Sequence, residues 1–344
     1  MKKTILVFRV GQLGDTLVSL PALQLIRESN VGSKIVLLTE RNDSKLNHVL
    51  SWDVIRPTGW VDDVVFYKPE KQLRKILSLF SLYKNLKKYN IDIVYDLSPE
   101  RSRYQLIRDK IIFKVTTRAR KILQGVVLPK QGKINGKLPT IEAEWLRLLK
   151  IVDPDYMYKN NFTLPPTVLG YPSSVLKATE RPNVMIGLGL ASKMPAKVWA
   201  LENYLLVCNK LNQQIDNLTF YLFGSKAESD YAEKIRKQYS GVMHNVCGKL
   251  SIYESATLLK ECNLYIGNDT GTMHLAALAG TKCLALFSAR DYPGQWYPLG
   301  NQNTILRKQV ECEGCMLEVC DKNNMCLNNI TCQEVFDNAI EILQ

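Results

Sequence analysis

Short, continuous apolar runs alternate with helical patterns along almost the whole chain, and this alternation limits the fold more than any other feature. In the first half, strand-like runs at 5–10, 34–39, 64–66 and 91–96 are separated by helical patterns at 16–29 and 71–88, and a further amphipathic helix is predicted at 142–152. Strands that are buried on both faces and separated by helices pair in parallel through right-handed crossovers. The pattern therefore predicts a doubly wound α/β sheet, which binds ligands at the carboxyl ends of its strands.

The second half repeats this alternation after a proline-rich interruption. Strand-like runs at 184–189, 218–223, 264–267 and 282–287 alternate with helical patterns at 200–211, 228–238, 252–261 and 272–279. Proline fixes φ and offers no amide donor, so the stretch between the halves is interpreted as a linker. We expect a first domain at 1–165, a linker at 166–182, a second domain at 183–330 and a terminal helix at 331–344 that can cross back to the first domain.

The 344 residues carry 45 Lys and Arg against 33 Asp and Glu, a net charge of +12. A basic surface favours anionic partners, namely nucleic acid, anionic lipid or phosphorylated sugars. No nucleic-acid recognition motif accompanies the charge, so a nucleic-acid partner is not expected. No apolar run approaches the ~20 residues of a membrane-spanning helix, and the first run already contains Arg9. A cytoplasmic location is expected.

The first motif with chemical potential is a Gly-x-x-Gly turn, in which Gly11 and Gly14 precede Asp15 after the first strand. Two glycines let another molecule approach the backbone closely. Asp15 has two interpretations. It is either a helix cap, which accepts amide hydrogen bonds from the first helical turn, or a general base at the carboxyl end of a strand.

The second motif joins the strand at 264–267 to the following helix and reads Asp269-Thr270-Gly271-Thr272-Met273-His274. Free amides at a helix N-terminus, together with the positive end of the helix dipole, form an anion site. Gly271 lets a diphosphate reach the backbone, and the two threonines add hydroxyl donors. His274 lies one helical turn further, on the same side.

These motifs resemble the signatures of glycosyltransferase family 9, whose best-known members are the lipopolysaccharide heptosyltransferases. The matching stretches are 9–23, Asp96-Leu97 with Arg101-Ser102, Asp269-Thr270-Gly271 with His274-Leu275-Ala276-Ala277 and Gly280, and Phe287, Pro293, Trp296 and Pro298. The resemblance implies a GT-B fold, in which two Rossmann-like doubly wound domains face each other across a cleft. It also implies an inverting transfer, without a catalytic metal or other cofactor, from a nucleotide diphosphate sugar.

The resemblance assigns roles to individual residues. Asp15 matches the catalytic base, Lys197 a lysine on the donor diphosphate, and Glu228 a residue on the nucleotide ribose. Asp269 matches an acidic residue near the donor sugar. Thr270, Gly271 and His274, with Thr272 beside them, match the diphosphate-binding turn. The expected reaction moves heptose from ADP-heptose to a lipopolysaccharide core or a related glycolipid acceptor.

The chain departs from the family on the donor side. Leu188-Gly189 stands where family members usually have Pro-Gly, and Trp199-Ala200 where they have Trp-Pro. This weakens the inference of ADP-heptose but not that of a nucleotide sugar. Two alternatives stay open: a nucleotide-sugar epimerase of the same architecture, and a non-catalytic module that binds sugar nucleotides.

The acceptor side is expected in the first domain, where the resemblance places it. Cations gather between residues 101 and 121, with only Glu100 and Asp109 opposing them. We expect Gly14, Arg101, Arg103, Arg118 and Arg120 to contact the acceptor. Part of the basic segment would then meet phosphorylated glycolipid at the inner face of the inner membrane.

Five of the nine cysteines fall between Cys312 and Cys332. Cys312, Cys315, Cys320 and Cys326 have a spacing that permits a structural zinc site, although a second Cys-x-x-Cys is missing. Disulfides are the second interpretation, but a cytoplasmic chain argues against them. Reduced cysteines that pack a C-terminal tail are the third, and zinc is not favoured over it.

Overall fold

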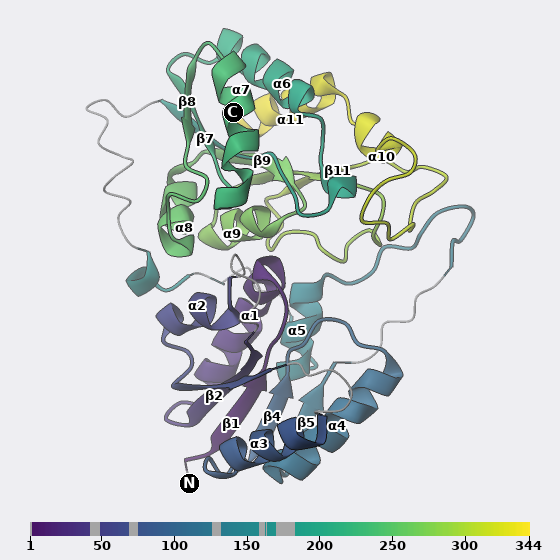
Figure 1. Ribbon diagram of the computed structural model, residues 1–344. Helices are drawn as coiled ribbons and strands as arrows, with labels where there is room; N and C mark the ends of the chain where they lie inside the picture. The colour runs from purple at the N-terminus through teal and green to yellow at the C-terminus, as the bar shows by residue number, and fades with distance from the viewer. Residues whose placement is uncertain are drawn as a thin grey trace. The chain divides into compact units, whose positions relative to one another are not determined.

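The computed structural model describes residues 2–41, 49–68, 75–125, 132–157, 162, 164–169 and 183–344. They form two compact α/β units, each built on one parallel sheet (Figure 1). Unit 1 comprises Met1–Lys130 and Glu144–Lys159, and unit 2 comprises Gln131–Ala143 and Asn160–Gln344. The prediction of two doubly wound parallel sheets is confirmed.

The sheet of unit 1 has the strand order β3-β2-β1-β4-β5, and every neighbouring pair is parallel. Its strands are β1 (Thr4–Phe8), β2 (Lys34–Glu40), β3 (Asp63–Tyr67), β4 (Ile93–Asp96) and β5 (Lys121–Gln124). Its helices are α1 (Leu13–Ser29), α2 (Ser51–Ile55), α3 (Lys75–Lys87), α4 (Arg103–Thr117) and α5 (Glu144–Val152). Ile5 and Leu6 are fully buried, as expected of a central strand covered on both faces.

The sheet of unit 2 has the order β11-β10-β9-β6-β7-β8, again with parallel pairs only. Its strands are β6 (Val184–Gly189), β7 (Leu218–Leu222), β8 (Val242–Asn245), β9 (Leu264–Asn268), β10 (Cys283–Phe287) and β11 (Thr304–Arg307). Its helices are α6 (Leu201–Gln214), α7 (Ser229–Gln238), α8 (Ile252–Glu261), α9 (Gly271–Ala279), α10 (Met325–Asn328) and α11 (Cys332–Leu343).

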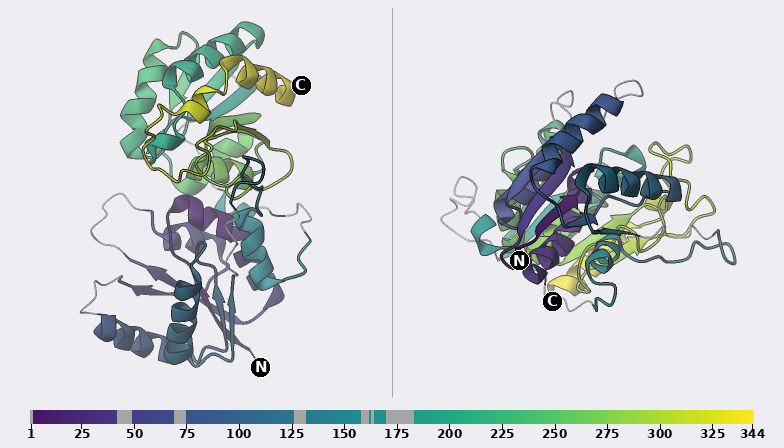
Figure 2. Two further views of the ribbon diagram at one scale, coloured as in Figure 1. Left: turned by 90° about the vertical axis from the view of Figure 1, so that its right-hand side faces the viewer. Right: turned by 90° about the horizontal axis from the view of Figure 1, so that it is seen from below.

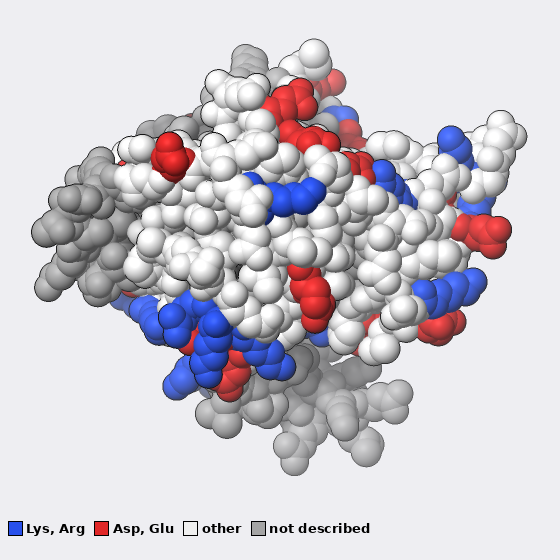
Figure 3. Space-filling model, turned by 90° about the horizontal axis from the view of Figure 1, so that it is seen from above, with Lys and Arg blue, Asp and Glu red and all other residues white. Residues whose placement is uncertain are grey.

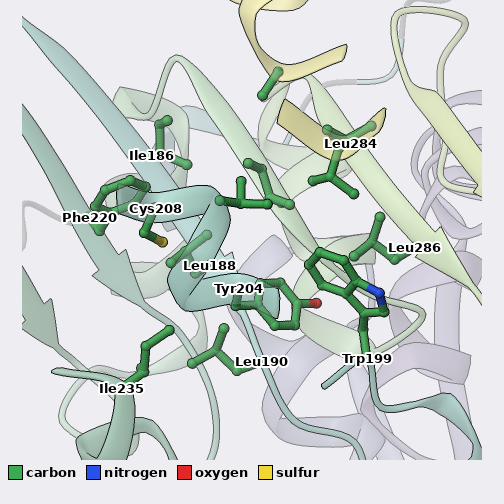
Figure 4. Close-up of a cluster of buried hydrophobic side chains, with 14 of the residues drawn as sticks. Ile186, Leu188, Leu190, Trp199, Tyr204, Cys208, Phe220, Ile235, Leu284 and Leu286 are labelled. Carbon is green, nitrogen blue, oxygen red and sulfur yellow. The ribbon is translucent and has the colours of Figure 1, made fainter. Parts of the chain in front are cut away.

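The core of unit 2 is built around the aromatic pair Trp199 and Tyr204, whose rings meet edge to face at 4.8 Å between centroids (Figure 4). Leu188 and Leu286, from two strands of the sheet, belong to the same buried cluster. Because Trp199 lies two residues after Lys197, just past the turn Pro195–Lys197, this core helps to fix the position of a predicted donor-site residue.

The structure differs from the sequence patterns at the smallest elements. Strands β5, β8 and β11 were not predicted, because each is only four residues long and partly exposed. Helix α1 begins at Leu13 rather than at Thr16. Gln12 occupies the N-cap position, so Asp15 is the third residue of the helix and not its N-cap residue.

Residues 131–143 belong to unit 2, although they interrupt the segments that form unit 1. The Ile141 amide donates to the Pro293 carbonyl at 2.9 Å, and the Leu138 amide donates to Glu313 Oε1 at 2.5 Å. The division expected at 166–182 did not include this exchange. A hydrophobic pattern cannot reveal it, because the segment is held by backbone hydrogen bonds rather than by a packed apolar face.

The terminal helix α11 packs on α6 and on strands β9 and β10, and its Val335, Phe336 and Ala339 join the core of unit 2. These contacts of α11 lie in unit 2, and a crossing back to the first domain stays a prediction. Of the predicted linker, Pro166–Val168 form a 3-10 turn, and residues 170–182 lie outside the described residues.

Charge is unevenly distributed over the surface. On the face shown in Figure 3, Lys and Arg form one group beside acidic residues and are otherwise scattered among uncharged ones. On this face, the positive charge is therefore not spread evenly. In the parts of the chain that the structure describes, no helix has the length and apolar character needed to cross a bilayer.

Candidate active site

In the turn between β1 and α1, the side chain of Asp15 lies against the backbone of Gly11 and Gln12. Gly11 has φ +127°, a conformation that side chains rarely adopt, and a Cβ there would lie 2.7 Å from Asp15 Cβ and 2.8 Å from Asp15 Oδ2. The same Oδ2 accepts a hydrogen bond from the Gln12 amide at 2.7 Å. One carboxylate oxygen thus serves as a helix cap, and among the described residues none bonds the other.

Arg9 ties this turn to the neighbouring strand. Its side chain is fully buried, and its guanidinium donates to the carbonyls of Asp15 and Leu97. Burial lowers the pKa of Arg9 to about 10, and the nearby carboxylates of Asp15 and Glu144 oppose that effect. The guanidinium therefore remains charged at neutral pH. No role was predicted for Arg9 from the sequence, although a cation directly after an apolar strand is itself a signal.

A second buried pair lies beside it. Arg147 and Glu144, on α5, bond through two contacts of 2.7 Å each, and Arg147 also donates to the Ser98 carbonyl at 3.0 Å. Asp96, the last residue of β4, accepts from the Ser98 amide and from Gln124, both at 3.0 Å. We call Arg9, Asp15, Asp96, Glu144 and Arg147 the unit 1 charge cluster. Neither Glu144 nor Arg147 was predicted from the sequence to be functional.

The expected acceptor-binding residues are not gathered at one place in unit 1. Gly14 lies in the first turn of α1, and Arg101 is partly buried, with its guanidinium 6.0 Å from the centre of the Phe8 ring. Arg103 begins α4 and Arg118 caps its other end, so the two are about 22 Å apart along a 15-residue helix. Arg120 is exposed in the loop before β5. Gly14 is the neighbour of Asp15 in the first turn of α1, whereas the four arginines lie along and beside α4.

The donor residues of unit 2 do come together. Lys197 Nζ lies 2.5 Å from Asp269 Oδ2 and 3.4 Å from Asp291 Oδ2, and Arg290 bonds Asp291 at 2.7 Å. His274 Nε2 is 4.0 Å from the other oxygen of Asp269. Burial lowers the pKa of Lys197, but the charges of Asp269 and Asp291 outweigh it, and the net shift is upward. Lys197 is therefore a fixed, partly buried cation.

Asn268 fixes the two turns that carry this ion cluster, although the sequence analysis gave it no role. Its Oδ1 accepts from the Trp199 amide and from the Tyr204 hydroxyl, each at 3.1 Å. Its Nδ2 donates to the Leu190 carbonyl at 2.8 Å. The turn after β9 is thus joined to the turn after β6, and Lys197 is held close to the start of α9.

The first residues of α9 are ordered by a chain of hydroxyl groups. Tyr265 and Thr272 are bonded at 2.8 Å, and Thr272 and Thr270 at 2.9 Å. A Cβ at Gly189 would lie 1.8 Å from the Tyr265 hydroxyl. Gly189 therefore makes room for the tyrosine, which explains why the glycine of the Leu188-Gly189 pair is needed even though the preceding proline is absent.

Glu228 lies apart from this cluster, in the short turn Lys226–Glu228 after β7. Its Oε2 accepts from the Ser225 amide at 2.6 Å. Strand β7 lies next to β6, so Glu228 shares the carboxyl edge of the sheet with the ion cluster. One oxygen of the Glu228 carboxylate thus caps the turn, and the side chain is partly exposed.

Four of the clustered cysteines line one small cavity: Cys312, Cys315, Cys320 and Cys326. Within the described ranges, no three Cys, His, Asp or Glu side chains are arranged to hold a metal ion, and the nine thiols are free. Burial raises the pKa of Cys326, and the thiols of Cys320 and Cys312 add to the effect. The loop is anchored by Arg290, which donates to the carbonyls of Met316 and Leu317.

Comparison with known proteins gives one family. A family model described as glycosyltransferase family 9 (heptosyltransferase) matches residues 153–325. A lipooligosaccharide heptosyltransferase 2 of Campylobacter jejuni is 29% identical over 160 residues, which cover 45% of this chain and 49% of the relative. The chain thus spans about half the length of this relative.

Solved structures agree in fold. The family 9 glycosyl transferase of Veillonella parvula superposes with a TM-score of 0.71 at 17% identity, over 99% of this chain and 97% of the other. The ADP-heptose lps heptosyltransferase II of E. coli superposes with a TM-score of 0.70 at 18% identity, over 100% and 98%. These similarities, with the two parallel-sheet units, confirm the predicted GT-B fold.

Proposed function

The chain belongs to glycosyltransferase family 9, and on this basis we propose that it transfers a sugar from a nucleotide diphosphate donor to a hydroxyl of a glycolipid core. ADP-heptose is the proposed donor, because similar proteins are described as heptosyltransferases and one as using ADP-heptose. The acceptor is the core of a lipopolysaccharide or lipooligosaccharide. The observation that carries the proposal is the protonated, partly buried Lys197 held beside the first turn of α9.

The donor diphosphate would bind at the start of α9. The free amides of the first helical turn and the hydroxyls of Thr270 and Thr272 are aligned donors for phosphate oxygens. Lys197 now faces Asp269, so a bound diphosphate would share or take over this cation. His274 and Asp269 would contact the diphosphate and the sugar from the same turn. Glu228, at the same sheet edge, would accept a ribose hydroxyl with its second oxygen.

The transfer step is a displacement at the anomeric carbon. The acceptor oxygen forms the new bond while the bond to the diphosphate breaks, and the configuration inverts. Negative charge grows on the leaving diphosphate, where Lys197 and the α9 amides stabilise it without reorganising. These groups supply the charge that a metal ion provides in other transferases, so the proposed reaction needs none.

Asp15 would receive the proton of the acceptor hydroxyl. Its Oδ2 is fixed by the Gln12 amide, and Arg9 holds the Asp15 carbonyl, so the position of the carboxylate is set from two sides. A general base must lie within hydrogen-bond reach of the proton it removes, and a fixed carboxylate meets this need better than a mobile one. Gly14, the neighbour of Asp15, and Arg101 would contact the acceptor.

We also propose a cytoplasmic location, with peripheral contact to the inner face of the inner membrane, where a glycolipid acceptor would be found. Arg103, Arg118 and Arg120 are exposed cations of unit 1 and would meet phosphate groups of lipid or glycolipid. Their separation along α4 fits an extended anionic surface better than a single sugar phosphate.

The proposal is tested by acceptor-dependent turnover. The protein is incubated with ADP-heptose, or with other nucleotide diphosphate sugars, and a lipopolysaccharide core acceptor, in the presence of a chelator. We expect release of the nucleoside diphosphate only when the acceptor is present, and NMR of the product should show an inverted anomeric centre. An epimerase would instead change the donor sugar without acceptor, and a binding module would bind donors without any turnover. Either result, or a retained configuration, would contradict the proposal.

A further inference from the structure

Helix α4 exposes an apolar stripe that its own unit does not use. Tyr104, Ile107, Ile111 and Val115 are 76%, 61%, 58% and 65% exposed, respectively. Their spacing of three, four and four residues places them within an arc of about 80° on the helix, at 100° per residue. A surface helix normally turns charged and polar residues outward, so this stripe needs another explanation.

The inner face of α4 already satisfies the packing of unit 1. Phe113 is 2% exposed and belongs to the core beneath the helix, and Thr116, Thr117 and Asp109 are buried on the same side. The stripe lies on the opposite side. The helix is therefore apolar toward the core and also apolar outward, and only the inward face is required for folding.

Cations border the stripe on both sides. By the same helical geometry, Arg103, Lys110 and Lys114 lie along one edge and Arg108 along the other. Asp109 is the only carboxylate of α4; it is buried, and it pairs with Arg108 at 2.6 Å. The outward face of α4 thus combines four apolar side chains and four cations with no exposed acid.

The neighbouring helix also exposes apolar and basic side chains. Helix α3 packs beside α4 (Figures 1 and 2), and its Phe80 is 67% exposed. Lys84 and Lys87 of α3 add exposed cations. Leu79 of α3 is exposed as well.

We propose that the outward face of α4 is an interfacial membrane-binding helix, which lies in the plane of an anionic bilayer. The stripe would enter the boundary between headgroups and acyl chains, while the flanking cations contact lipid phosphates. Apolar insertion and charge attraction add in helices of this kind, so we expect both the stripe and the flanking cations to contribute to membrane binding. The proposal deepens the proposed function, since it names the element that would bring a glycolipid transferase to its acceptor.

A second copy of the chain fits this surface less well. In a two-fold contact through the stripe, the cations of one helix would face those of the other, and like charges directly opposed are unfavourable. An anionic bilayer offers apolar depth and negative charge together. The charge pattern therefore favours lipid as the occupant.

The test is co-sedimentation with vesicles of phosphatidylethanolamine and phosphatidylglycerol, compared with pure phosphatidylcholine. The full chain should bind the anionic vesicles, and added salt should weaken binding only in part, since apolar insertion is not screened. The double variant Ile107→Ser/Ile111→Ser should bind the anionic vesicles about tenfold more weakly or worse, because two apolar side chains that would insert into the bilayer are lost. Leu206→Ser/Val319→Ser is the matched control, since these residues of unit 2 are 53% and 67% exposed; it should bind like wild type.

The outcomes separate this proposal from its premise. Equal binding by both double variants, or no binding by wild type, overturns the role of α4. A stripe variant that changes only the sedimentation coefficient of the free protein also overturns it, in favour of self-association. Transfer to a lipid-free core oligosaccharide should be unchanged in Ile107→Ser/Ile111→Ser. If wild type binds vesicles through α4 but transfers no sugar to any acceptor, the proposed function fails and the membrane helix stands.

Discussion

At the residue scale, Asp15 combines a structural and a proposed chemical role in one carboxylate. Oδ2 caps α1 through the Gln12 amide, which leaves the second oxygen for an acceptor hydroxyl. Asp15→Asn keeps the size and one acceptor oxygen but cannot take a proton. We expect turnover to fall by about 10²–10⁴-fold, while the donor Kd stays near wild type. Asp155→Asn, in an exposed turn of the same unit, is the control. Near-normal turnover in Asp15→Asn would leave only the capping role.

Gly11 tests whether the close packing of this turn matters. An alanine there would need φ +127° and would place Cβ 2.7 Å from Asp15 Cβ. We expect Gly11→Ala to lower the free energy of unfolding by roughly 1–3 kcal/mol and to reduce turnover as Asp15 moves. Gly32→Ala separates the two causes, because Gly32 has φ +76° but no atom within 4 Å of its Cβ position. It should show backbone strain with normal turnover, measured by denaturant unfolding and by kcat. Equal effects of the two variants on kcat would argue against crowding at Asp15.

At the scale of elements, the sequence pattern predicted most of the long strands and helices, though not the 15-residue α4. It did not predict the polar connections between the elements. The strand that ends at Asn268 was expected, because a continuous apolar run reports burial on both faces. The bonds from Asn268 to Trp199, Tyr204 and Leu190 were not, because they join residues 64 to 78 positions apart. The same holds for Arg9, whose partner Leu97 lies 88 residues away. Local periodicity carries no information about such pairs.

The resemblance to a known family compensated for part of this gap. It assigned both Lys197 and Asp269 to the donor site, and in the structure Lys197 Nζ lies 2.5 Å from Asp269 Oδ2. The run of cations in the sequence grouped Arg101, Arg103, Arg118 and Arg120, and α4 places the first two and the last two at its opposite ends. Clustering in sequence therefore does not imply a compact site here, because a 15-residue helix places its two ends about 22 Å apart. Contact of these arginines with the acceptor stays a prediction.

The ion pairs that join Lys197 to Asp269 and Asp291 lead to a prediction about the pH dependence of donor binding. Although burial opposes it, the carboxylates of Asp269 and Asp291 raise the pKa of Lys197 above its usual 10.5. Lys197 therefore stays charged as pH rises, and its contribution to folding is present below 10.5 and lost only above the raised value. Between about pH 7 and pH 9, donor affinity should not fall through loss of this charge.

Lys197→Met should weaken donor binding by about tenfold to a hundredfold at pH 7, because a charge-assisted contact to phosphate is lost. Titration calorimetry with ADP-heptose, or with ADP alone, measures both effects. Lys193→Met, an exposed lysine in the same loop, is the control. The prediction is contradicted if the donor Kd of wild type rises steadily from pH 7 to pH 9 while that of Lys197→Met does not. Lys197 would then titrate in this range.

At the scale of the whole molecule, the chain passes between its units more than once. Unit 1 is interrupted by residues 131–143, which belong to unit 2, before α5 returns to unit 1. The Ile141 amide bonds Pro293, and a Cβ at Gly294, which has φ +93°, would lie 2.1 Å from the Ile141 carbonyl oxygen. A single cut in the predicted linker therefore leaves this segment covalently joined to unit 1 while it is bound to unit 2.

This exchange predicts how a cut chain behaves. A protease site inserted within the predicted linker at 166–182 should yield two fragments after cleavage. We expect them to co-elute in gel filtration without denaturant and to separate in denaturant, because residues 131–143 of the first fragment remain hydrogen-bonded to the second. Gly294→Ala should make the cut chain dissociate at lower denaturant concentration, since its Cβ crowds the Ile141 carbonyl. Gly280→Ala, at a glycine of unit 2 with φ +90° and no atom within 4 Å of its Cβ position, controls for backbone strain alone. If Gly294→Ala and Gly280→Ala shift dissociation equally, residues 131–143 do not hold the fragments together, and other contacts must do so.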